Sequence, residues 1–211
     1  GASADGIARV VGRELSQALG QPVVVDNKPG AGGALGLIAV AKSPAAGYTL
    51  LMAAAGPTVI NPSLYGNMPF DPAKDLAPVS LLVRDYNLMA VNPAVPAKTV
   101  QEFIAYAKAH PKDIAFGSPG NGTPAHLGGE LFNQMTGTTM LHVPYKGSGP
   151  AVSALISGQI NVMIDNMPAL LPQVKAGKLR ALAVASETRA SGPPPIPTVS
   201  ESRLPGLAVT P

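Results

Sequence analysis

Apolar positions along the chain follow two periods, one typical of helices and one typical of strands. Over residues 4–19 the apolar side chains recur on one helical face, at Ile7, Val10, Val11, Leu15 and Leu19. Gly20 follows as a stop signal. The same kind of pattern, with capping residues such as Thr99 and Thr123, predicts further helices over 32–42, 99–107, 124–136, 150–156 and 168–176. In helix 124–136, the stripe expected to be buried is Leu127, Leu131 and Met135.

Short aliphatic and β-branched runs between these helices predict strands. They lie at 22–26, 48–52, 77–83, 88–91, 114–117, 140–145, 160–164 and 179–185. Alternating strands and helices on short loops indicate an α/β fold with a mainly parallel sheet covered on both faces. One sheet of this many strands would be very wide, so two lobes are expected. The predicted division is 1–84 and 85–204, with 205–211 returning toward the first lobe.

Composition excludes several classes of protein. Among the 211 residues, 46% are hydrophobic, which is ample for a core, and the net charge of +3 is spread without a basic block. The four Phe and five Tyr do not cluster with cations, so no nucleic-acid partner is expected. Cys is absent, which removes thiolate chemistry, and no two His have metal-ligand spacing, so no metal site is expected.

The most suggestive loop joins strand 114–117 to the capped helix at Thr123. It contains the candidate ligand-binding residues Ser118, Gly120, Asn121, Gly122 and Thr123. The glycines allow successive N–H groups to turn toward one point, and the helix dipole adds partial positive charge there. The loop therefore fits an anion site built from backbone, although a plain tight turn fits the same spacing.

Two loops of the first lobe also fit either a ligand contact or a purely structural role. One is the start of the chain, with Gly1, Ala2, Ser3 and Asp5 leading into a helix. Asp5 is more typical of a helix cap than of an acid–base catalyst. The other follows strand 48–52 and offers Ala55, Gly56 and Thr58, whose small size suits close backbone approach to a ligand or, equally, close packing.

Catalytic and cofactor motifs are weak. Gly30, Gly32 and Gly36 do not have the dinucleotide spacing, so no cofactor is expected. The nucleophile-elbow pattern is also missing. His126, in the first turn of helix 124–136, either reaches a bound anion or caps its own helix. Asp165, which ends a strand, fits a ligand contact and an N-cap equally well. No catalytic residue is predicted.

Six motifs occur in a characteristic order. They are 1–5, 25–33, 60–65, 117–123, 142–147 and 197–199. Together they resemble the substrate-binding proteins of tripartite tricarboxylate transporters, the Bug receptor family, over essentially the whole chain. The resemblance implies a two-lobed Venus flytrap in the periplasm, each lobe having its own mainly parallel sheet. It also implies a monomer that closes on a small carboxylate and delivers it to membrane transporter subunits.

The ligand expected from the resemblance is a dicarboxylate, an acidic amino acid or an aromatic carboxylate. Loops matching 1–5 and 54–58 would hold one end of it, and the loop matching 118–123, with the region of Asp165, the other. Two departures stand out. The family has a strand before Gly1 and continues past Pro211, so we expect this sequence to be truncated at both ends. Pro57 and Thr58 replace a common Thr-His pair, which leaves ligand identity open.

Two rival functions belong to other classes. An enzyme acting on a small carboxylate or phosphate would use His126 as general base. A ligand-sensing domain of a signalling system would bind the same ligand and pass the signal to a membrane partner.

Overall fold

The computed structural model describes residues 3–64, 69–111, 113–187, 189 and 195–208. Its helices are α1 (Ser3–Leu19), η1 (Ala31–Gly33), α2 (Ala34–Ala41), η2 (Gly56–Ile60), α3 (Asn61–Leu64), α4 (Pro72–Asp75), α5 (Val100–Ala109), α6 (Pro124–Thr136), α7 (Ser148–Ser157) and α8 (Met167–Lys175). Its strands are β1 (Asn87–Val91), β2 (Ala115–Ser118), β3 (Leu141–Pro144), β4 (Val162–Asn166) and β5 (Arg180–Val184). No helix in these ranges is long and apolar enough to cross a membrane.

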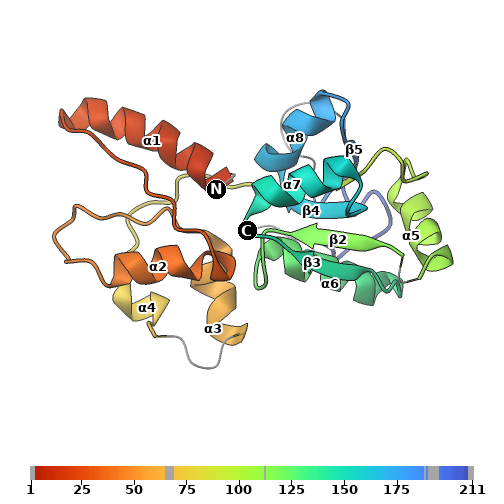
Figure 1. Cartoon of the computed structure of the whole chain (residues 1–211), viewed down its shortest axis with the longest axis horizontal. Helices are drawn as coiled ribbons and strands as arrows, with labels where there is room; N and C mark the ends of the chain where they lie inside the picture. Colours follow the sequence, from red (N-terminus) through yellow and green to blue (C-terminus); the bar gives the residue numbers. More distant parts are fainter. Residues whose placement is uncertain (1–2, 65–68, 112, 188, 190–194, 209–211) are drawn as a thin grey trace.

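All five strands form one mixed sheet with the order β3-β2-β4-β1-β5. Strand β2 runs parallel to β3 and β4, as the alternating pattern predicted, whereas β1 runs antiparallel to both β4 and β5. Figure 1 shows α1–α4 to one side of this sheet and α5–α8 packed around it. We call residues 3–84 the amino-terminal part and residues 87–207 the sheet-bearing part, within the described ranges.

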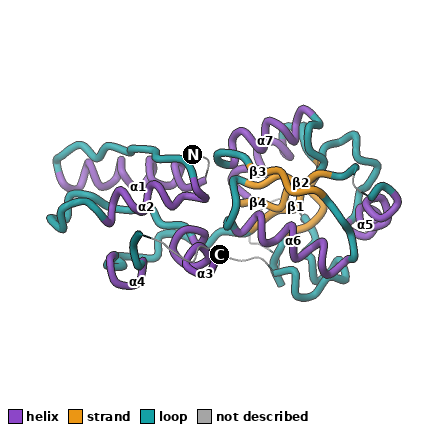
Figure 2. Tube along the Cα trace, turned by 60° about the horizontal axis from the view of Figure 1, so that its bottom comes forward, coloured by secondary structure: helices purple, strands orange, loops and turns teal. Residues whose placement is uncertain are grey.

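Helices cover both faces of the sheet. Alternate side chains of β1 enter two separate cores, Met89 and Val91 on one face and Leu88 and Ala90 on the other. The first core is completed by α5 and α6, including Phe103 and Phe132, and the second by α7 and α8. Figure 2 shows β1–β4 between α7 and α6. This three-layer α/β arrangement fixes the loops at the strand ends, where the candidate site lies.

The prediction of a second sheet in the first lobe is wrong for the described residues. Segments 22–26, 48–52 and 77–83 are not strands, and several of their apolar side chains face solvent, including Val24 at 84% and Tyr48 at 95% exposure. A strand requires a neighbour to complete its hydrogen bonds. None of the three segments pairs with another described segment, so a strand-like composition alone does not make a sheet.

Two smaller corrections concern β1 and α6. Strand β1 enters the sheet at the carboxyl end of β4, where Asn87 lies opposite Asn166, and this entry makes it antiparallel. On α6 the buried side is formed by small residues and Phe132, while Leu127 and Met135 are 37% and 39% exposed. The reason is Gly129, whose missing side chain lets the Phe116 ring pack directly on the helix.

The remaining predicted helices and strands are confirmed with shifts of a few residues at their ends. Thr99 accepts the Glu102 N–H at 3.2 Å and caps α5, as the capping-box pattern predicted. Left-handed glycines at 137 and 158 end α6 and α7. The division at residues 84 and 85, and the return of 205–211, stay predictions.

Candidate functional site

The loop between β2 and α6 is held by its own side chains. Ser118 is fully buried, and its Oγ lies 3.1 Å from Gly120 O and 3.2 Å from Gly120 N. Thr123 Oγ1 donates to Gly120 O at 2.7 Å and accepts the His126 N–H at 3.3 Å, which makes Thr123 the N-cap of α6. The two hydroxyls therefore shape the loop at the positive dipole end of α6.

The rings of His126 and His142 pack against the loop. His142 Nε2 lies 2.7 Å from Ser118 Oγ, and the ring stacks between Phe116 and His126 with centroid distances of 4.8 and 4.1 Å. Burial, and secondarily the neighbouring His126, lower the pKa of His142 to about 4. His126 Nδ1 accepts the Gly122 N–H at 3.3 Å. This bond joins His126 to the loop before its helix, and the two roles left open for His126, a contact with a bound anion and a cap of its own helix, stay predictions.

The Ser118–His142 contact resembles a nucleophile and its base, yet it is unsuited to catalysis. Ser118 has no exposed surface, and a histidine with a pKa of about 4 is a poor base at neutral pH. Donor atoms of His126, Glu130 and His142 also lie within 4.8 Å of one another, a proximity that sequence spacing could not reveal. Because the two rings are stacked at 22°, their lone pairs run side by side instead of converging on one metal position.

The loop lies directly against two glycines of the amino-terminal part. A β-carbon on Gly32 would collide with Asn121 O, and one on Gly56 would lie 3.2 Å from Gly122 O. The structure thus brings predicted residue Gly56 to the predicted loop 118–123. Ala55 begins this helical turn, while the Thr58 hydroxyl donates to Ala54 O at 2.7 Å and so serves the turn itself.

One residue at this junction was not singled out from the sequence. Asn61, at the start of α3, has no exposed surface, and neither atom of its amide has a hydrogen-bond partner in the described part of the structure. It lies beside Gly122. The motif 60–65 contributed to the family resemblance, but no periodicity or capping signal marked Asn61 as functional.

Asp165 lies at the end of β4 and is almost fully buried. Desolvation raises its pKa to about 6, against the opposing effects of the Ser148 hydroxyl and the Asn166 N–H, and the nearby Asp85 adds to the rise. One oxygen of each carboxyl, Asp165 Oδ2 and Asp85 Oδ2, has no hydrogen-bond partner among the described residues. Asp165 therefore has a property that the sequence did not indicate: it is a buried carboxyl that resists ionisation.

The predicted residues at the start of the chain are only partly described. Gly1 and Ala2 lie outside the described residues, and for Ser3 only its backbone place in α1 is described. Asp5 accepts from Asn27 Nδ2 at 2.8 Å and pairs with Arg9 Nε at 3.0 Å, and these two contacts hold the pKa of Asp5 below its usual value. Both contacts are with side chains, so the interpretation of Asp5 as a helix cap stays a prediction.

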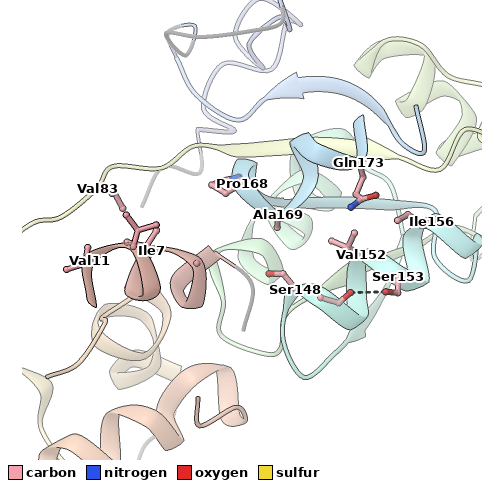
Figure 3. A pocket seen from close by; sticks show the side chains of 13 residues that line it. Ile7, Val11, Val83, Ser148, Val152, Ser153, Ile156, Pro168, Ala169 and Gln173 are labelled. Carbon is pink, nitrogen blue, oxygen red and sulfur yellow. Dashed lines mark hydrogen bonds between the residues drawn. The ribbon is translucent and has the colours of Figure 1, made fainter. Parts of the chain in front are cut away.

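An open cavity of about 750 Å³ lies between α1 and the pair α7–α8 (Figure 3). Ile7 and Val11 of α1 and Val83 face Val152 and Ser148 of α7 and Ala169 of α8 across it. None of the predicted site residues lines this cavity, although Ser148 connects it to Asp165. The cavity and the loop 118–123 are therefore separate features of the same junction.

Comparison with known proteins gives a consistent picture. A family model for the tripartite tricarboxylate transporter family receptor, TctC, matches residues 7–210. Protein BugT of Bordetella pertussis is 42% identical over 212 residues, covering 100% of this chain and 65% of BugT. The chain therefore spans about two thirds of the length of this curated relative.

Three solved structures are also similar. A structure described as a periplasmic transporter has a TM-score of 0.95 and 44% identity over 99% of this chain and 70% of its own. Rpa4515 of R. palustris with adipate has a TM-score of 0.94 and 38% identity, covering 97% and 69%. MatC of Rhodopseudomonas palustris with bound malate has a TM-score of 0.93 and 31% identity, covering 100% and 71%.

Proposed function

Because the chain belongs to the tripartite tricarboxylate transporter receptor family, we propose that it captures a small carboxylate by lobe closure and delivers it to membrane transporter subunits. The periplasmic localisation expected from the sequence is confirmed by the family and by its relatives of known structure. Relatives bind adipate and malate, as their structures record. The ligand proposed here is of the same chemical kind: a dicarboxylate, an acidic amino acid or an aromatic carboxylate.

The observation that carries the proposal is the meeting of loop 118–123 with Gly32 and Gly56. One side of this junction is a capped helix N-terminus, which favours an anion without a cationic side chain. The other side belongs to a different part of the chain. A ligand bound between them contacts both, and a ligand shifts an open–closed equilibrium only through such a difference in contacts.

The proposed site follows from this geometry. Asn121 and Thr123 supply the backbone donors, while the N–H groups of Gly120 and Gly122 are held by Ser118 Oγ and His126 Nδ1, which fix the shape of the loop. The segments 1–5 and 55–58 would hold the ligand from the first lobe, and Asp165 would contact its other end. The lobes are proposed as 1–84 and 85–204, with 205–211 returning to the first, in a monomeric receptor.

A thermal-shift screen tests the proposal. The protein is heated with adipate, malate, glutamate and benzoate in turn, each at a concentration well above a micromolar dissociation constant. A receptor melts at a higher temperature with one class, by an amount that grows with ligand concentration, and the compound is recovered unchanged. No shift with any carboxylate contradicts the proposal, and consumption of the compound would instead indicate the rival enzyme.

A further inference from the structure

Asn61 is buried at the junction between the two parts of the chain. It is the first residue of the short helix α3, and its exposed surface is 0%. Both Oδ1 and Nδ2 lack a hydrogen-bond partner among the described residues, so the conclusion does not depend on which way the amide is turned. A buried amide without partners is costly, which makes an unpaired asparagine here a feature that requires a reason.

The neighbours of the amide are the two glycine-rich loops. A β-carbon on Gly122 would collide with Asn61 Oδ1, and one on Gly32 would lie 3.8 Å from Asn61 Nδ2. The side chain therefore faces the loop that leads into α6. Gly122 itself has φ +75°, a left-handed conformation that any side chain would strain, so both sterics and backbone favour glycine opposite Asn61.

The nearest comparison within the molecule is Asn92, which is also buried. Its Nδ2 donates to Leu155 O at 2.8 Å and Ile156 O at 3.1 Å, and its Oδ1 accepts the Ala94 N–H at 2.8 Å. That amide fastens β1 to α7 and is fully used in the fold. Asn61 has the same polar group and none of these contacts, so a purely structural role explains Asn92 but not Asn61.

We propose that Asn61 is a ligand-binding residue of the carboxylate site, contributed by the amino-terminal part. Its Nδ2–H donates to a carboxylate oxygen that rests on the first turn of α6. This inference depends on the proposed receptor function and adds a residue to it. The contact forms when the two glycine-rich loops part by about the width of an oxygen atom, which entry of a ligand between them requires in any case.

Substitution with leucine separates a ligand contact from a structural role. Asn61→Leu keeps the size of the side chain and removes the unpaired amide, so the ligand-free protein should be as stable as before or more so. Its affinity should nevertheless fall about tenfold or more, because a hydrogen bond to a charged group is lost. Asn61→Asp places a like charge beside the carboxylate and should weaken binding further. Asn92→Leu is the matched control, expected to lose stability while keeping its affinity.

The measurement is calorimetric titration with adipate, malate, glutamate and benzoate, together with the melting temperature of each ligand-free variant. The inference is supported if Asn61→Leu binds more weakly while its ligand-free melting temperature is unchanged or higher. Folded Asn92→Leu should keep its dissociation constant. An unchanged dissociation constant in Asn61→Leu overturns it while leaving the receptor function intact. If the unmodified protein binds none of the four compounds, the receptor proposal fails, and the inference fails with it.

Discussion

At the scale of single residues, unpaired polar groups gather near the junction of the two parts. Asn61 lies between the glycine-rich loops, and the carboxyls of Asp85 and Asp165 each keep one oxygen without a partner in the described structure. Asp85 belongs to the segment that leads into β1, and Asp165 ends the neighbouring strand β4. Such groups cost stability, and proteins tend to retain them at functional sites.

The raised pKa of Asp165 gives a pH prediction. Its folded pKa of about 6 lies above the usual 3.8, so the folded state holds this proton more tightly, and stability falls as pH rises from about 4 to about 6. The loss by pH 7 is on the order of 3 kcal/mol. Asp165→Asn should remove this loss, so its stability advantage over the unmodified protein should grow across that window.

Urea unfolding at pH 4, 5, 6 and 7 measures the effect. The lowered pKa of His142 acts in the opposite direction, adding stability as pH rises from about 4 to 6.5, but it is common to both proteins and cancels in their difference. Asp113→Asn, at an exposed position, is the control. A difference between Asp165→Asn and the unmodified protein that stays constant with pH would show that Asp165 ionises as freely in the fold as outside it.

At the scale of elements, local signals placed the helices and strands of the sheet-bearing part, but not the direction of β1 or the buried side of α6, and they failed for the strands expected before it. The cap at Thr99, the loop into α6 and the glycine stops are encoded within a few neighbouring residues, and the structure has them where the sequence placed them. Strands 22–26 and 48–52 needed a distant partner that composition does not specify. The loop 118–123 was predictable because its signals lie within a few neighbouring residues. The position of Asn61 was not predictable, because the residues around its side chain are remote in sequence.

Two glycines in helices should respond oppositely to alanine. A β-carbon on Gly129 of α6 would collide with the Phe116 ring, so Gly129→Ala should destabilise the protein by about 1–3 kcal/mol through overpacking. Gly6 of α1 has no atom within 4 Å of an added β-carbon, so Gly6→Ala should stabilise by about 0.5–1 kcal/mol. Denaturant midpoints compare the two, and equal effects would refute the close packing of Phe116 on α6.

At the scale of the whole molecule, the fold is that of a binding protein, and the family match supports a receptor in preference to an enzyme. The first-lobe sheet that the resemblance implied is not seen in the described residues. The structure does contain the junction of the two parts. There, Gly32 and Gly56 allow the amino-terminal part to approach the loop before α6. Close approach at this point is the structural basis for the proposed closure.

Gly56→Ala tests that approach. The added methyl would lie 3.2 Å from Gly122 O and 3.6 Å from Thr123 Cα, so it would fill the space between the loops that a ligand oxygen needs, and carboxylate affinity should fall several-fold. Gly56 has no left-handed backbone, but it precedes Pro57, which crowds a β-carbon on a helical residue, so some loss of stability is expected and the melting temperature is measured beside the affinity. Gly36→Ala, whose methyl meets only ordinary contacts in α2, is the control. Titration calorimetry gives both affinities, and equal values would mean that closure does not depend on this contact.

The most direct test of the account is calorimetric titration of the unmodified protein with adipate, malate, glutamate and benzoate, followed by recovery of each compound. A carboxylate receptor should bind at least one of these compounds saturably, one to one, and the compound should be recovered intact. Failure of all four to bind, or chemical conversion of the one that binds, would contradict the conclusion that this protein is a carboxylate receptor.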